Sequence, residues 1–455
     1  MTGPGTITEA AAALRAGETT SVAIVERALA RAEKFDHALG AFITRFDDEA
    51  LAAASAADVE LSAGTDQGPL HGIPIAIKDL LSTREGPTTA GSSAQDPELF
   101  HRADSTVVAR LRAAGAVIIG KASLAEYAVG VPDLTKPFPV PRNPWAPDHW
   151  AGGSSGGSAN AVAAGLALGA IGTDTGGSVR LPAAFCGITG LKTTWGSVNL
   201  TGCIPLAWSF DTVGPMARSA ADCRLILDVI RDAPPGGAPD ELADLGGLRI
   251  GYDRLAAVTT ATDDGHVEAF DLALATLAEA GAELVELPLP DYATIVAANQ
   301  VVLLCEGLTH HLDGLRARWL GYGRATRQFL LGGLAFTGPD YVQAQRIRAR
   351  SWQQATALFR DVDFHLSPVA TIGAPALDDL LEGDRGRIFG STHTQYWSAV
   401  GVPAVAIPIG FTNTGLPLSM QIAGAAGRDH AVLAVAEVFQ SRTDFHLAEA
   451  KSFSR

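Results

Sequence analysis

The chain has 455 residues and a formal net charge of -15, with 47% hydrophobic and 18% charged residues. This composition supports a large buried core and argues against an intrinsically disordered chain. The negative charge, together with the lack of any long run of Lys and Arg, argues against a nucleic-acid partner. The four cysteines form no CxxC pair and no apolar run reaches about 18 residues, so we expect a cytoplasmic protein without a membrane partner.

The hydrophobic pattern predicts helices and strands that alternate along the chain, which is typical of an α/β fold. Helices are expected over residues 7–42 (as two helices, the second capped by Thr20 or Ser21), 106–115, 266–280, 306–332, 341–360 and 430–441. Buried or half-buried strands are expected over residues 71–80, 116–121, 248–252, 283–289, 364–371, 404–411 and 417–424. The first of these strands is predicted to be half-buried and to end at Lys78 and Asp79.

Two segments are expected to be irregular. Residues 127–150 contain six prolines, so they predict a long loop, and a long ordered loop beside a candidate site is often functional. Residues 232–247, rich in Pro and Gly, are the best candidate for a linker. Because the strands on both sides of that linker can belong to one sheet, we expect one domain over residues 1–455.

Two Gly/Ser-rich turns suggest chemistry. GGSSGGS (152–158) and TGGS (175–178) enclose an apolar segment that predicts a helix followed by a short strand. Glycine-rich turns expose successive N–H groups that can hold an anion. The second turn offers the N–H groups of Thr175, Gly176, Gly177 and Ser178 beside the Ser178 hydroxyl. A nucleophile next to such donors suits acyl transfer, although a non-catalytic binding turn would look similar.

Lys78 is the candidate base. A lysine at the end of a strand is ordinarily exposed, but if Lys78 is buried, desolvation lowers its pKa from about 10.4 toward neutrality and permits base chemistry. The sequence contains none of the motifs that would indicate four other kinds of site. There is no HExxH zinc pair, no GxSxG nucleophile elbow, no phosphate loop ending in GK[ST] and no dinucleotide GxGxxG at these turns.

Three blocks in this order closely resemble the amidase signature family: GIPIAIKD (72–79), GGSSGGS (152–158) and GTDTGGSVRLPAAFCGITGLKTT (172–194). Ser154 and Ser178 are 24 positions apart, the interval expected for that family. The resemblance covers nearly the whole chain, with a signature core at about 65–225 and a variable region that forms the substrate pocket at about 255–400. Asn160 departs from the small residue usual in the family.

The resemblance implies a Ser-Ser-Lys triad. Ser178 would be the nucleophile, Ser154, at a cis peptide, would bridge it to Lys78, and neutral Lys78 would accept the proton. The resemblance also implies an oxyanion hole made by the N–H groups of residues 175–178, and supporting roles for Ser155 and Arg180. It implies a single α/β domain with a mixed twisted sheet covered by helices on both faces, and no metal or organic cofactor.

The function expected from these residues is hydrolysis of a small amide, with carbamates and esters as further substrates. The pocket is expected to form from residues 131–150, 203–210 and 388–397 and from the helices after Glu306. Their many apolar side chains favour an apolar or aryl substrate. Two alternatives stay open: a glutamine-hydrolysing subunit of a tRNA-dependent amidotransferase, and a catalytically silent ligand-binding protein. The oligomeric state is open, with a homodimer as one option.

Overall fold

A computed structural model describes residues 5–96, 98–99, 103–129, 131–232, 242–383, 385–450 and 453. Within these residues eleven strands form one sheet in the order β1-β3-β2-β4-β6-β5-β10-β11-β9-β7-β8. The strands are β1 (Phe42–Arg45), β2 (Pro74–Lys78), β3 (Val117–Ala122), β4 (Gly169–Asp174), β5 (Thr189–Lys192), β6 (Thr212–Ala217), β7 (Arg249–Tyr252), β8 (Glu283–Glu286), β9 (Phe364–Pro368), β10 (Ala404–Phe411) and β11 (Pro417–Gly424). β2 runs parallel to β3 and β4, whereas β10 and β11 pair antiparallel, so the expected mixed sheet is confirmed.

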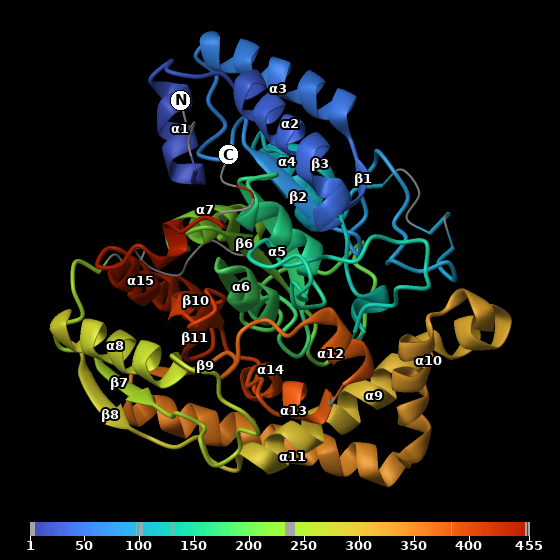
Figure 1. Cartoon of the computed structure of the whole chain (residues 1–455), viewed down its shortest axis with the longest axis vertical. Coiled ribbons are helices and arrows are strands. Elements are labelled where there is room, and N and C mark those ends of the chain that lie inside the picture. The colour runs from blue at the N-terminus through green and yellow to red at the C-terminus, as the bar shows by residue number, and fades with distance from the viewer. Residues whose placement is uncertain are drawn as a thin grey trace.

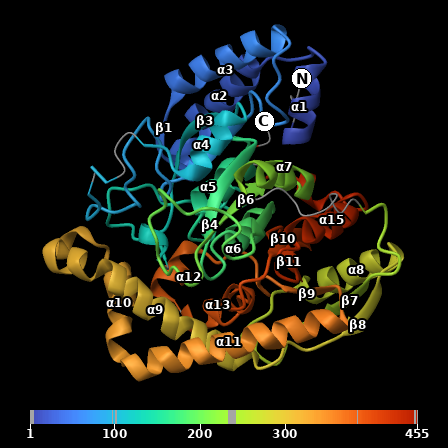
Figure 2. The ribbon, with the colours of Figure 1, turned by 180° about the vertical axis from the view of Figure 1, so that it is seen from behind.

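Helices cover both faces of this sheet (Figure 1). One core is shared by the strands with α1 (Ile7–Arg15), α4 (Thr106–Ala113), α7 (Ala220–Ile230), α8 (His266–Glu279) and α15 (Asp429–Gln440). A second core includes α2 (Ser21–Leu39), α3 (Asp47–Ser62), α5 (Gly156–Ala163) and α6 (Arg180–Cys186). Although α7 and α15 are far apart in the sequence, they lie side by side in both views (Figure 1, Figure 2).

A further group of helices gathers in the lower part of Figure 1. It comprises α9 (Tyr292–Ala317), α10 (Arg324–Leu331), α11 (Gly338–Asp361), α12 (Leu377–Glu382), α13 (Arg385–Phe389) and α14 (Gln395–Ala399). Short 3₁₀ turns occur at η1 (Glu126–Ala128), η2 (Trp319–Gly321), η3 (Gly332–Ala335) and η4 (Phe445–Leu447). The helices α9 to α14 all lie within residues 255–400, the region that the sequence analysis expects to be variable and to form the substrate pocket.

Strands from both sides of residues 232–247 enter the same sheet, so the single α/β domain is confirmed. Most of the linker candidate, residues 233–241, lies outside the described residues. The expected half-burial of β2 is wrong, because all five of its residues are buried between β3, β4 and the helices that cover them. Thr20 is the N-cap of α2, where its side chain accepts a hydrogen bond from the N–H of Ala23.

In the part of the chain that the structure describes, α9 is the one helix long and apolar enough to cross a membrane. The sequence contains no uninterrupted apolar run there, because Asn299, Gln300 and Glu306 break it. In the fold α9 packs against α10, α11 and α14. Asn299 and Glu306 are both about 1% exposed, so polar as well as apolar side chains of α9 face the protein interior.

Candidate active site

Lys78 ends β2 with its side chain fully buried. Its Nζ donates hydrogen bonds to three hydroxyl oxygens: Ser154 Oγ at 2.7 Å, Ser155 Oγ at 2.9 Å and Thr173 Oγ1 at 2.7 Å. All three partners are neutral. Burial therefore lowers the pKa of Lys78 to about 7, although the more distant carboxylates of Asp174 and Asp211 partly oppose the shift.

A second buried lysine has a different environment. Lys121, on the neighbouring strand β3, forms an ion pair with Asp79 at 2.9 Å and donates to the carbonyl oxygen of Leu81 at 2.7 Å. The carboxylate that follows Lys78 in the sequence is thus paired with Lys121 instead. This pairing leaves Lys78 without a carboxylate partner, and sequence reasoning, which assigned Asp79 no role, missed it.

The two Gly/Ser-rich turns meet in space. A cis peptide bond joins Gly153 to Ser154, as the resemblance implied. The N–H of Ser155 donates to the carbonyl oxygen of Ser178 at 3.1 Å, and Ser154 and Ser178 line the same cavity. Ser178 is half-buried, and its hydroxyl makes no hydrogen bond to any described residue. The hydroxyl at the proposed reaction centre is therefore free to meet a ligand.

Asp174, at the end of β4, organises the second turn. Its buried carboxylate accepts hydrogen bonds from the N–H groups of Gly177 (2.7 Å) and Val179 (3.2 Å) and from the Arg180 guanidinium (3.1 Å). Burial by itself would raise the pKa of Asp174, but the Arg180 charge and these donors outweigh it and hold the pKa below its usual range. Asp174 thus stays ionised, and sequence reasoning did not name it.

Arg180 connects this turn to β11 and α14, which lie far from it in the sequence. Its Nη1 donates to Gln421 Oε1 on β11 at 2.8 Å, and its Nη2 donates to Ser398 Oγ on α14 at 2.8 Å. The side chain is fully buried and lies outside the residues that line the cavity. This position suits the supporting role expected for Arg180.

The geometry of the turn bears on the expected oxyanion donors. The N–H of Gly177 donates a hydrogen bond to the buried carboxylate of Asp174, so it points away from the cavity. The N–H groups of Thr175, Gly176 and Ser178 have no acceptor among the described residues. Thr175 is held by its side chain, which donates to Asp211 Oδ1 at 2.6 Å. Three of the four expected donors are therefore free.

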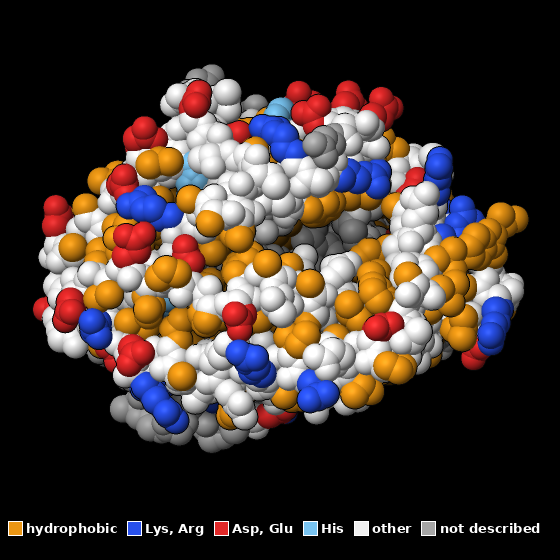
Figure 3. Space-filling model, turned by 90° about the horizontal axis from the view of Figure 1, so that it is seen from below, with side chains coloured by type: hydrophobic (Ala, Val, Ile, Leu, Met, Phe, Trp, Pro, Cys, Tyr) orange, Lys and Arg blue, Asp and Glu red, His pale blue; other side chains and the backbone are white. Residues whose placement is uncertain are grey.

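The cavity at these turns has a volume of about 550 Å³. Its large apolar side chains are Trp150, Leu181, Leu206, Leu303, Phe329 and Phe389. Its longer polar side chains are Gln300, Gln328, Arg385, Thr392, Thr394 and Gln395. Residues from all four segments expected to form the pocket are present, and Arg385 is the one charged side chain among the described lining residues. Seen from below, this end of the molecule has a hollow surrounded largely by hydrophobic side chains (Figure 3).

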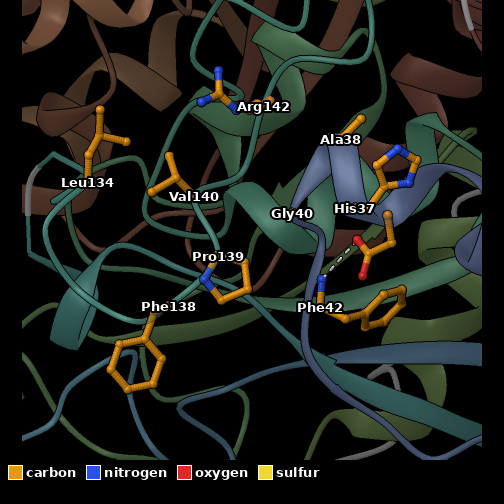
Figure 4. Close-up of a pocket in the computed structure, with 10 residues that line it drawn as sticks. His37, Ala38, Gly40, Phe42, Leu134, Phe138, Pro139, Val140 and Arg142 are labelled. Atoms are coloured by element: carbon orange, nitrogen blue, oxygen red, sulfur yellow. Dashed lines mark hydrogen bonds between the residues drawn. The ribbon is translucent and has the colours of Figure 1, made fainter.

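A separate cavity of about 400 Å³ lies between the end of α2 and the loop around Pro139 (Figure 4). His37, Phe138 and Arg142 are among its lining residues, and Lys78, Ser154 and Ser178 are not. Asp36 accepts a hydrogen bond from the N–H of Ala41 there at 2.6 Å. This cavity is therefore distinct from the one that Ser154 and Ser178 line.

Comparison with known proteins identifies the family of the chain. The model of the family described as Amidase matches residues 23–433. This chain belongs to the amidase family. The putative amidase AmiD of Mycobacterium tuberculosis is 38% identical to it, with 97% of this chain and 94% of that protein aligned. A glutamyl-tRNA(Gln) amidotransferase subunit of Methylococcus capsulatus is also 38% identical, with 97% of each chain aligned. A crystal structure of an amidase superposes with a TM-score of 0.85 and 33% identity, covering 96% of this chain and 99% of the other.

Within this member of the amidase family, the structure brings Lys78, Ser154, Ser155 and Ser178 together at the carboxyl ends of β2 and β4. The residues that sequence analysis missed fall into two groups. Thr173 and Asp174 lie inside the matched block 172–194, so their positions carried a signal. Gln300 and Leu303 lie before the pocket segments expected after Glu306, so only the fold shows that they line the cavity, whereas Thr394 and Gln395 belong to the expected segment 388–397.

Proposed function

We propose that this amidase-family protein hydrolyses the carbon–nitrogen bond of a small amide through an acyl-enzyme on Ser178. The observation that carries the proposal is the contact between a buried lysine and Ser154, next to the free hydroxyl of Ser178. With a pKa of about 7, Lys78 is neutral in much of the protein near neutral pH and can accept a proton. A permanently charged lysine could not act as a base.

The proposed reaction has two halves. Ser178 Oγ attacks the carbonyl carbon, while its proton passes to Ser154 Oγ and the Ser154 proton passes to Lys78 Nζ. The free N–H groups of residues 175, 176 and 178 would stabilise the oxyanion. The C–N bond then breaks as the amine receives a proton back along the same relay. Water, deprotonated by the same path, cleaves the acyl-enzyme and releases the carboxylic acid.

The cavity favours a small apolar or aryl substrate. Trp150, Phe329 and Phe389 supply large apolar surfaces, and a volume of about 550 Å³ limits the size of the ligand. Carbamates and esters could enter the same relay, because their tetrahedral steps are alike.

The amidotransferase subunits among the relatives support a second candidate, hydrolysis of glutamine in a complex with partner subunits. Free glutamine carries a carboxylate and an ammonium group, and burial of both charges requires partners of both signs. Arg385 can pair with the carboxylate, whereas no described lining residue is Asp or Glu. This charge pattern favours the small-amide hydrolase. Assay of the isolated chain with a simple anilide and with glutamine separates the two candidates.

The first experiment is labelling with a fluorophosphonate followed by intact and peptide mass spectrometry. We expect one adduct, on the peptide that contains Ser178, and no adduct on Ser178→Ala. An adduct elsewhere would disprove the assignment of the nucleophile. Folded protein that neither reacts with the probe nor hydrolyses any amide would favour a silent ligand-binding protein.

A further inference from the structure

Gln395 presents an unsatisfied polar atom beside the proposed reaction centre. It is the first residue of α14 and lines the cavity together with Ser154 and Ser178. Its Cγ is the nearest neighbour, at 3.8 Å, of a β-carbon placed on Gly176. The Gln395 side chain therefore lies against the turn that carries the proposed oxyanion donors.

The carboxamide oxygen of Gln395 is buried, and no described residue donates a hydrogen bond to it. A buried polar atom without a partner destabilises the folded protein, so such atoms are rare unless a ligand satisfies them. Here the atom belongs to a side chain that lines the cavity, where a bound substrate can approach it.

The backbone on both sides of Gln395 is fixed. Thr394 Oγ1 donates to the carbonyl oxygen of Gly176 at 2.6 Å, and Ser398 Oγ accepts from Arg180 at 2.8 Å. Tyr396 and Trp397, the next two residues, are fully buried. Because α14 cannot shift without breaking these contacts, a rigid element holds Gln395 at the cavity. A residue that determines substrate specificity needs such a fixed position.

We propose that Gln395 selects substrates that carry an N–H group at the bond to be cleaved, so that this site prefers amides to esters. The inference rests on the proposed function and deepens it. A substrate N–H donates to Gln395 Oε1 and removes the penalty for burying that oxygen. An ester of the same acid has no such hydrogen and leaves the oxygen unpaired. A site that hydrogen-bonds a substrate N–H discriminates strongly against analogues that lack it.

The test compares N-(4-nitrophenyl)butanamide, the anilide, with 4-nitrophenyl butyrate, the ester; both have the same acyl group and the same 4-nitrophenyl ring, and they release 4-nitroaniline and 4-nitrophenol respectively. Gln395→Met keeps the length of the side chain and removes the carboxamide. We expect kcat/KM for the anilide to fall about tenfold in this variant and kcat/KM for the ester to stay within about twofold, the size of one net hydrogen bond. Gln300→Met, which removes another carboxamide from the same cavity, is the matched control and should leave the anilide-to-ester ratio unchanged.

Thermal unfolding separates ligand recognition from a structural role. Because Gln395→Met removes an unpaired buried oxygen, its Tm should equal or exceed that of the wild type. An equal loss for both probes, an unchanged ratio, or the same change in Gln300→Met would overturn the proposal. Wild-type protein that hydrolyses the ester but not the anilide would also overturn it. Hydrolysis of neither probe, or of both by Ser178→Ala, would instead overturn the proposed function and this inference with it.

Discussion

Thr394 Oγ1 donates a 2.6 Å hydrogen bond to the carbonyl oxygen of Gly176, more than two hundred residues earlier in the chain. The next N–H along the chain, that of Gly177, donates to Asp174 at 2.7 Å. The peptide group between Gly176 and Gly177 is therefore held at both ends. A side chain at Gly177 could not fit, because a β-carbon there would lie 2.0 Å from Thr394 Oγ1. Thr394 thereby fixes the orientation of the neighbouring N–H groups, which we propose as the oxyanion donors.

Replacement of Thr394 should lower the rate of the chemical step. Thr394→Val keeps the shape of the side chain and removes the hydrogen bond to Gly176, so we expect kcat to fall about tenfold with little change in KM. Thr394→Ser keeps the hydroxyl and should recover most of the rate. Steady-state kinetics of the three proteins check this prediction. A rise in KM at constant kcat would mean that Thr394 contributes to substrate binding alone.

The pH dependence of catalysis should follow Lys78. Only the neutral amine accepts a proton, so kcat/KM should be low in acid and rise as the pH passes about 7, the pKa that burial gives this lysine. Lys78→Met should lose roughly 10²–10⁴-fold in rate, the usual contribution of a general base.

Lys192 is a matched control for this titration. It is also buried with a pKa lowered to about 7, and it donates to the carbonyl oxygen of Thr193 at 2.8 Å, away from the cavity. The pH–rate profile of Lys192→Met should keep its rise near pH 7. If the rise near pH 7 disappears in Lys192→Met but remains in Lys78→Met, the titrating group is Lys192, and the assignment of the rise to Lys78 is wrong.

The buried pair of Asp174 and Arg180 should be important for stability. Asp174→Ala leaves the Arg180 guanidinium buried without its counter-charge, so we expect the free energy of unfolding to fall by about 3–5 kcal/mol. Glu283→Ala breaks the exposed pair with Arg249 and should cost at most about 1 kcal/mol. Denaturant unfolding of both variants measures the difference, and equal losses would contradict a special role for the buried pair.

Arg385 should affect which charged substrates enter. Its Nε donates to the carbonyl oxygen of Leu380 at 2.9 Å and its Nη2 to that of Leu381 at 3.1 Å, and no described residue accepts from Nη1. We expect Arg385→Gln to raise KM about tenfold for an anilide with a carboxylate on its acyl chain, and much less for the neutral anilide. Arg385→Lys controls for charge. If KM changes equally for both anilides, Arg385 does not bind the substrate carboxylate, and its role is to stabilise the end of α12.

Local patterns in the sequence determined much of this protein. The alternating apolar residues before Lys78 predict β2, and the glycine-rich blocks 152–158 and 172–194 mark the two turns that hold Ser154 and Ser178. Helices with one apolar face, such as α1 and α2, were also predictable, because the period of 3.6 residues is a property of the sequence itself. The short strands β5 and β6 were not, because they are buried throughout and show no alternation.

Only the tertiary structure decided how the groups pair. The sequence places Asp79 next to Lys78, yet Asp79 lies in the turn after β2 and pairs with Lys121 of the adjacent strand β3. The same holds for the Gly177 N–H, which donates to Asp174, and for Thr394 and Gln395 at the start of α14, which the fold places against the turn at 175–178. Hydrogen bonds and burial depend on separations of a few ångströms, and for residues far apart in the chain those separations exist only in the folded protein.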